Sequence, residues 1–155
     1  MENIIEKSIA KARETMLKNI GGPFGAAVID KNGTILSVSS NRVLGDNDPT
    51  AHAEVNAIRE ACKVKKTYDL TGCTIYTTCY PCPMCLSAII WSNIKEVYYG
   101  CTPEDADNIG FRDDFLYDFI KNDVKDENVL KLISKGRDKC LPLFQEYQSL
   151  HKTIY

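Results

Sequence analysis

The sequence has no long hydrophobic run, no excess of basic residues and only two histidines. Its longest strongly apolar stretch, Cys85 to Trp91, is far too short to span a bilayer. Nineteen basic residues against 21 acidic ones give a net charge of −2, which argues against a surface built to grip duplex DNA or tRNA. A metal site that uses imidazole has only His52 and His151 to choose from.

Cysteine, by contrast, is frequent. Seven cysteines are present, an odd number, and the first residues lack the charged-then-apolar layout of a signal peptide. Both observations favour a reducing cytosol, in which thiols stay free or bind a metal, over a disulfide framework. We therefore expect a cytoplasmic protein with no membrane partner.

Length and periodicity indicate an α/β protein. A chain of 155 residues with 44% hydrophobic content is long enough to bury the core of one domain. Apolar residues three or four apart predict helices near residues 5–20, 51–62, 82–91, 111–119 and 143–154, the last reaching Tyr155. Runs rich in β-formers predict strands near residues 26–30, 34–39, 74–78 and 94–99. Strands separated by helices imply α/β layering with at least part of the sheet parallel.

Two short motifs carry the chemistry. One is the segment from Pro49 to Glu54, which contains His52, and the other is Pro81-Cys82-Pro83-Met84-Cys85. A Cys-x-x-Cys pair at a loop-to-helix turn can place both sulfurs on one metal, and His52 adds a third ligand. Three protein ligands with a vacant fourth position are typical of catalytic zinc, whereas structural zinc is closed by four. The vacant position holds water, and the metal lowers the pKa of that water towards neutrality.

Glu54 completes this set under one geometrical condition. Residues two apart in a helix point about 200° away from each other, so His52 and Glu54 share a site only if His52 lies at the very start of the helix. The Pro49-Thr50 pair just before it favours that placement. Glu54 would then contact the water without binding the metal, and would carry its proton to the substrate.

The two motifs together form the His-x-Glu and Pro-Cys-x-x-Cys signature of zinc nucleobase deaminases. The chain resembles the guanine deaminase branch of the cytidine-deaminase-like superfamily over nearly its whole length. The matching segments are residues 21–26, 47–55, 57–59, 81–86 and 110–115. The resemblance implies a three-layer α/β/α sandwich with a central mixed sheet of about five strands.

The resemblance also implies an organisation and a partner. Residues 1–155 would form a single deaminase domain, with the C-terminal segment, about residues 140–155, closing the active site. In some relatives this segment is exchanged between two subunits, so a homodimer is expected, with a small nucleobase as the other partner and no nucleic acid.

By the same resemblance, the reaction would be hydrolysis of guanine to xanthine and ammonia. One zinc ion per subunit would be held by His52, Cys82 and Cys85, and Glu54 would carry the proton. Five residues are implied to bind the base. Phe24 would stack on it, Asn41 would hydrogen-bond it, and the backbone at Ala53 would contact it. Asp113 would help to recognise the purine edge, and Tyr155 would close the site.

Several alternatives stay open at this point. Tyr80 stands where the superfamily commonly has glutamate, so guanosine, cytosine or tRNA adenosine could be the substrate instead. Asp113 and Asp114 could simply be first-turn acids that complement a helix dipole, and Asp114 could take the place of Asp113. Cys79 could close a four-ligand structural zinc with the other three residues, which would make the chain a binding module.

Overall fold

The computed structural model describes residues 3–155 of the chain. It divides into two compact units, one ending at Tyr117 and the other running from Asp118 to Tyr155. The sheet and its covering helices all belong to the first unit. Within the described residues, no helix is both long enough and apolar enough to cross a membrane.

The first unit is built on a mixed sheet with the strand order β2-β1-β3-β4. The strands are β1 (Gly25–Ile29), β2 (Ile35–Ser40), β3 (Thr74–Cys79) and β4 (Glu96–Cys101). β1 runs antiparallel to both β2 and β3, while β3 and β4 are parallel. The mixed sheet expected from the sequence is confirmed.

The number of strands is four among the described residues, where about five were expected. The segment after β4 instead starts a helix, α5 (Pro103–Asn108), because Thr102 and Asp105 form a capping box and Pro103 occupies the first turn. The described chain beyond α5 holds only helices and irregular segments.

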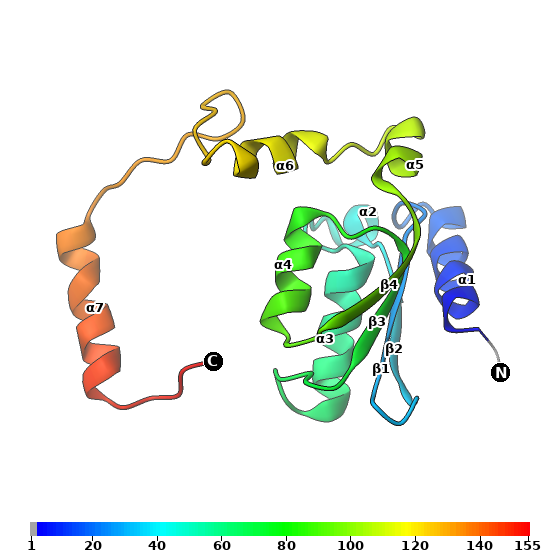
Figure 1. The fold of residues 1–155 in the computed structure, drawn as a ribbon, viewed down its shortest axis with the longest axis horizontal. Helices are drawn as coiled ribbons and strands as arrows, with labels where there is room; N and C mark the ends of the chain where they lie inside the picture. The colour runs from blue at the N-terminus through cyan, green and yellow to red at the C-terminus, as the bar shows by residue number, and fades with distance from the viewer. Residues whose placement is uncertain (1–2) are drawn as a thin grey trace. The chain divides into compact units, whose positions relative to one another are not determined.

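Helices cover both faces of the sheet, which gives the expected three layers (Figure 1). On one face lies α1 (Ile4–Leu17), which contacts β1, β2 and β3. On the other lie α3 (Ala53–Lys65) and α4 (Pro83–Trp91), which also contact each other. A four-residue helix, α2 (Val43–Asp46), interrupts the polar loop that precedes α3.

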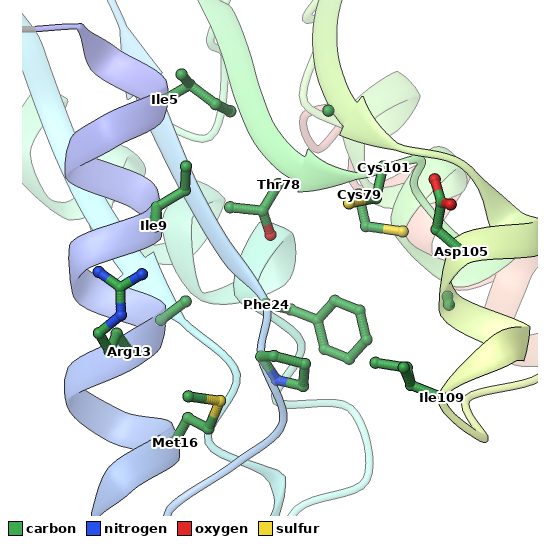
Figure 2. A pocket seen from close by; sticks show the side chains of 14 residues that line it. Ile5, Ile9, Arg13, Met16, Phe24, Thr78, Cys79, Cys101, Asp105 and Ile109 are labelled. Atoms are coloured by element: carbon green, nitrogen blue, oxygen red, sulfur yellow. The ribbon is translucent and has the colours of Figure 1, made fainter.

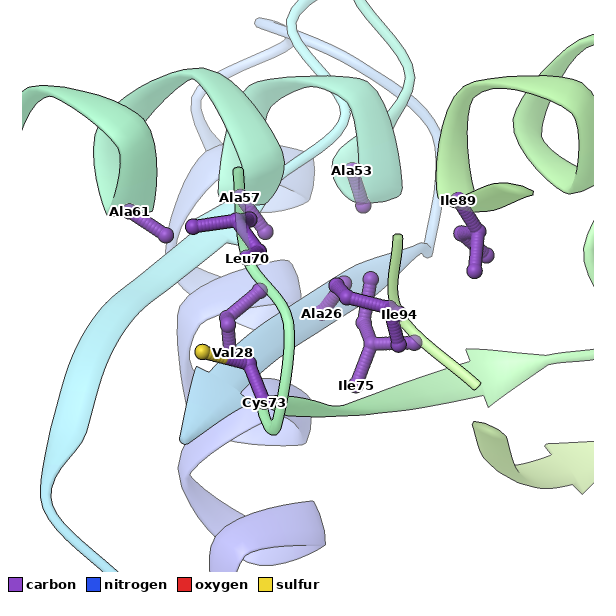
Figure 3. Close-up of a cluster of buried hydrophobic side chains, with 10 residues drawn as sticks. All are labelled: Ala26, Val28, Ala53, Ala57, Ala61, Leu70, Cys73, Ile75, Ile89 and Ile94. Carbon is purple, nitrogen blue, oxygen red and sulfur yellow. The ribbon is translucent and has the colours of Figure 1, made fainter. Parts of the chain in front are cut away.

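The core between α3 and the sheet brings the helix close to the strands. Ala53, Ala57 and Ala61 form a buried stripe along α3, and their small side chains allow this approach (Figure 3). Val28 and Ile75, both fully buried, face them from β1 and β3. The first turn of α3 is thereby held against the sheet, and the motif residues His52 and Glu54 flank the buried Ala53.

The second unit contains the end of α6 (Asp114–Lys121) and α7 (Arg137–Ser149). The expectation that the last helix reaches Tyr155 is wrong, because α7 ends at Ser149. Leu150 caps it, and His151 takes a left-handed backbone conformation, φ +49°, which no α-helix continues through. Apolar spacing at Leu150 and Ile154 continued the helical pattern past this break.

Candidate active site

The backbone at the start of α3 brings His52 and Glu54 to the same side. His52 is the N-cap residue, with an extended conformation (φ −69°, ψ 155°), and its carbonyl accepts the first helical hydrogen bond from Asn56. Glu54 lies in the first turn of the helix. Since the helix begins only after His52, the two side chains do not diverge as they would in mid-helix.

The cysteines lie at a second helix start of the same kind. Cys82 is the N-cap of α4 and has an extended backbone, Pro83 occupies the first turn, and Cys85 follows one turn later, fully buried. Pro83 suits this position because its missing N–H would have no helical partner there. Both thiols lie near a helix N-terminus, where the positive end of the dipole stabilises a thiolate.

The three predicted ligands form one compact cluster. The Nδ1 atom of His52 lies 3.6 Å from the Sγ of Cys82 and 3.5 Å from the Sγ of Cys85, and all three ligand atoms are within 4.8 Å of one another. Zinc bonds of about 2.3 Å to sulfur and 2.0–2.1 Å to nitrogen in a tetrahedron put neighbouring ligand atoms about 3.6 Å apart. The residues therefore fit a zinc ion in both donor type and spacing.

The pKa shifts of the two thiols also favour a metal site. The thiol of Cys85 donates towards Cys82 and, with the help of His52, holds the pKa of Cys82 down at about 4. Its donation to Cys82 and its burial raise the pKa of Cys85. A divalent cation between the two sulfurs would replace their protons and keep both as thiolates.

Glu54 lies against this cluster and is almost fully buried, with 6% of its surface exposed. Its Oε1 accepts a hydrogen bond of 2.9 Å from the hydroxyl of Thr77, and its Oε2 lies 3.4 Å from the Sγ of Cys85. Burial raises the pKa of Glu54. A carboxyl whose pKa is moved towards neutrality is suited to take up a proton and release it again.

A cavity of about 550 Å³ opens in front of Glu54 and the cluster. A volume of this size is typical of small-molecule sites. Among its lining residues are six that were expected to hold the metal, carry the proton or bind the base: Phe24, Asn41, His52, Glu54, Cys82 and Asp113. Cys79 and Tyr80, which the sequence left as open questions, line it as well. Cys85 lies behind them in the cluster and Ala53 is buried in the core, whereas Tyr155 belongs to the second unit.

One wall of the cavity is aromatic. The rings of Phe24 and Phe111 meet edge to face, with centroids 5.0 Å apart and an interplanar angle of 88°. A Cβ on Gly22 would lie 3.0 to 3.1 Å from both rings, so glycine is the residue that lets them approach the backbone here. Phe111 was expected inside a helix, but α6 begins at Asp114, and the preceding irregular segment turns Phe111 to the cavity.

Asn41 is fixed by its side-chain oxygen. Its Oδ1 accepts hydrogen bonds from the backbone N–H groups of Gly22, at 3.3 Å, and Val43, at 3.1 Å. A Cβ on Gly21 would overlap the Asn41 carbonyl at 2.1 Å, so this close packing also requires glycine. With its oxygen engaged, Asn41 offers its side-chain amide nitrogen as a donor to a ligand.

The two adjacent aspartates occupy different environments. Asp113 lines the cavity, and partial burial and the nearby Cys82 raise its pKa. Asp114 pairs with Arg112 at 2.7 Å, and this hydrogen-bonded partner lowers the pKa of Asp114. Of the two, Asp113 is the one placed to contact a molecule in the cavity.

Cys79 does not join the metal cluster. Its thiol lies 3.7 Å from the carbonyl oxygen of Thr102, and burial raises its pKa to about 11. Its partner in the parallel β3–β4 register is Cys101. Both cysteines line a second, mostly apolar cavity of about 480 Å³ beside α1 (Figure 2). The closed four-ligand arrangement that would make this a structural zinc site is therefore absent from residues 3–155.

Three residues around the site were not singled out from the sequence. Thr77 donates a hydrogen bond to Glu54, and Phe111 forms part of the cavity wall. The hydroxyl of Tyr117 donates a hydrogen bond of 2.9 Å to the carbonyl of Pro81, next to Cys82. The only sequence signal for Thr77 is a polar residue at an inward position of an alternating strand. The Tyr117 contact spans 36 residues and left no local signal.

Comparison with known proteins agrees with this geometry. Residues 1–101 match the family model described as the cytidine and deoxycytidylate deaminase zinc-binding region. Guanine deaminase from Bacillus subtilis (strain 168) is 44% identical over 128 residues, which cover 83% of this chain and 81% of that protein. A tRNA-specific adenosine deaminase from Haemophilus influenzae is 33% identical over 124 residues, 80% of this chain and 72% of that one.

The likeness extends to three dimensions. The X-ray structure of guanine deaminase from Bacillus subtilis matches with a TM-score of 0.90 and 39% identity, covering 98% of this chain and 96% of that chain. Zinc, expected from the motifs, is the metal of the matched family, and His52, Cys82 and Cys85 form the site that can hold it. The chain belongs to the cytidine and deoxycytidylate deaminase family of zinc-dependent hydrolases.

Proposed function

We propose that this protein is a guanine deaminase that hydrolyses the exocyclic amino group of guanine, with water, to give xanthine and ammonia. The observation that carries the proposal is the buried carboxyl of Glu54 beside the His52–Cys82–Cys85 cluster, at the base of a cavity of base-binding size. The likeness over almost the full chain to a protein named guanine deaminase supports the choice of base.

The proposed chemistry divides between the metal and the carboxyl. Zinc, when held by the three ligands, supplies a Lewis acid that makes water a nucleophile near neutral pH. Glu54 takes a proton from water as the water oxygen bonds to C2 of guanine, and delivers that proton to the ring nitrogen next to C2. It then carries the remaining proton of the new C2 hydroxyl to the amino group, and the C2–N bond breaks to release ammonia. The burial that raises the pKa of Glu54 favours both directions of this transfer.

The cavity walls would orient the base. Phe24 offers a flat face for stacking, and Phe111 supports it edge to face. The side-chain nitrogen of Asn41 would donate to an acceptor on the ring, and the carboxyl of Asp113 would face the N–H edge of the purine. Donors and acceptors on different walls favour a planar base that carries both kinds of group.

The C-terminal segment enters the same proposal. We propose that residues 140–155 close over the active site and that Tyr155 contacts the bound nucleobase. We also expect a homodimer, in which this segment is either exchanged between the subunits or kept within its own subunit. The support is that α7 carries large apolar side chains that are exposed, such as Leu143 (65%) and Phe144 (72%). Exposed apolar side chains gathered on one helix are typical of a surface that packs against another part of the protein or a partner. Tyr155→Ala should impair guanine turnover and leave zinc content unchanged.

A cytoplasmic location is part of the proposal as well. None of the seven cysteines forms a disulfide, and Cys101 and Cys140 lie on the surface. Exposed free thiols persist in a reducing compartment and oxidise outside one.

A panel of substrates tests the proposed reaction. The zinc-loaded protein is assayed for ammonia release from guanine, guanosine, cytosine, adenine and a tRNA anticodon hairpin, with xanthine identified by chromatography. We expect turnover with guanine to exceed every other substrate. Ammonia release from cytosine or the hairpin, with none from guanine, would show that the base has been assigned wrongly.

A further inference from the structure

The strand behind the active site carries a buried hydroxyl that points at the proton carrier. In β3 the residues at positions 75, 77 and 79 are buried while their neighbours are partly exposed, and the side chains of Ile75 and Thr77 face α3. Ile75 packs into the apolar core at this face (Figure 3). Thr77, only 1% exposed, is the polar member of the row.

The Thr77 hydroxyl lies within reach of two acceptors. Its Oγ1 is 2.9 Å from the Oε1 of Glu54 and 3.0 Å from the backbone carbonyl of Cys79. A hydroxyl has one proton and donates to one acceptor at a time. The ionised carboxylate is the stronger acceptor of the two, so the donation goes to Glu54 whenever that group is charged.

The hydrogen bond from Thr77 determines which carboxylate oxygen of Glu54 is directed to the metal cluster. With Oε1 held by Thr77 from β3, Oε2 is the oxygen directed to Cys85 and the metal cluster. The carboxylate is anchored on a central strand, paired on both sides by β1 and β4. Anchoring to a rigid element is what keeps a reacting group in productive geometry.

We propose that Thr77 is a positioning residue for Glu54, and that its hydroxyl holds the carboxylate in the orientation that transfers the proton. Thr77 does not line the cavity, so it acts on the reaction only through Glu54. The inference rests on the proposed function in that Glu54 must be the proton carrier. It adds a residue on a different element, 23 positions away in the sequence.

The test removes the hydroxyl and keeps the shape. Thr77→Val replaces the Oγ1 with a methyl group of similar size. We expect kcat for guanine to fall about 10- to 100-fold, the worth of one hydrogen bond to a charged group. KM and zinc content should stay close to the wild-type values, because Thr77 touches neither the base nor the metal ligands.

Thr15→Val is the matched control. Thr15 is also a buried threonine, but its hydroxyl bonds to the main chain of its own helix, α1, on the opposite face of the sheet. Its substitution should leave kcat unchanged. A fall in kcat equal to that of Thr77→Val would mean that loss of any buried hydroxyl, and not positioning, is responsible.

A second pair of variants keeps the test decisive if Thr77→Val does not fold. Thr77→Ser and Thr77→Ala differ only by the hydroxyl oxygen. Thr77→Ser should retain most of the wild-type kcat, whereas Thr77→Ala should lose about as much as Thr77→Val. Equal kcat values for serine and alanine, or wild-type kcat in Thr77→Val, would overturn the proposal.

A crystal structure of zinc-loaded Thr77→Val, or of Thr77→Ala, gives a readout independent of turnover. We expect the Glu54 carboxylate to rotate or become disordered, and an unchanged carboxylate would contradict the proposed role. If the wild-type protein does not deaminate guanine, the proposed function fails. The positioning role is then still tested by this structure and by the same variants on whichever base is turned over.

Discussion

Replacement of Glu54 by glutamine separates proton transfer from every other property of the site. Glutamine has the same shape, and its side-chain oxygen can still accept the 2.9 Å hydrogen bond from Thr77. It cannot take up a proton from water. A positioned proton carrier contributes roughly 10²- to 10⁴-fold to the rate. At 1.36 kcal/mol for each factor of ten, the expected loss is about 3 to 5 kcal/mol of barrier.

The fold should tolerate this change. Burial raises the pKa of Glu54, so the charged carboxylate is disfavoured in the folded protein. A group whose pKa is raised on folding stabilises the protein below its unfolded pKa, and this stabilisation is lost as the pH rises through the folded value. At pH 7 the neutral amide should therefore leave the Tm of the metal-free protein unchanged or slightly higher.

The assay is steady-state xanthine formation, with zinc content and Tm measured on the same samples. Glu60→Gln is the control, because Glu60 lies on the same helix but pairs with Lys63 at the surface. It should behave as wild type. If Glu54→Gln keeps its zinc and turns guanine over within tenfold of the wild-type rate, Glu54 is not the proton carrier.

Four other substitutions probe the ligands, the cavity wall and the loop that carries Cys82. Cys85→Ala should lose zinc and activity together, whereas Cys79→Ala should retain the full zinc content. Metal analysis of both variants checks this, and loss of zinc from Cys79→Ala would favour the four-ligand site. Phe24→Ala should raise KM for guanine more than it lowers kcat, since it removes a stacking surface worth about 1 kcal/mol; an unchanged KM would place the base elsewhere. The Tyr117 hydroxyl can donate to the Pro81 carbonyl only while it is protonated, and burial raises its pKa to about 12. The folded protein should therefore lose stability as the pH rises from about 10, the unfolded value, through about 12. The Tm difference between wild type and Tyr117→Phe should shrink over that range, and a constant difference would contradict the assignment.

The parts of the site that could be predicted from the sequence are those fixed by local spacing. The x-x gap in Cys82-x-x-Cys85 and the helix start after His52 place side chains through one turn of backbone, so the motif alone indicates the cluster. The same holds for the layered fold, because strand and helix periodicities are short-range signals. The cluster and the three layers are both present in the structure.

The remaining features depend on contacts between distant segments. The Thr77–Glu54 bond requires the packing of β3 against α3, and no pattern near residue 77 reveals it. α2 and α5 are only four and six residues long, too short to show a helical period. At the end of α7 the sequence pattern is longer than the helix itself. The apolar spacing continues beyond Ser149, while the left-handed backbone at His151 stops the helix.

Zinc K-edge X-ray absorption on the zinc-loaded protein tests most directly whether this site is built for catalysis. The account predicts two sulfur ligands at about 2.3 Å and two nitrogen or oxygen ligands at about 2.0–2.1 Å, one of them exchangeable with solvent. Three sulfur ligands, with Cys79 as the third, would close the metal to water and contradict the account.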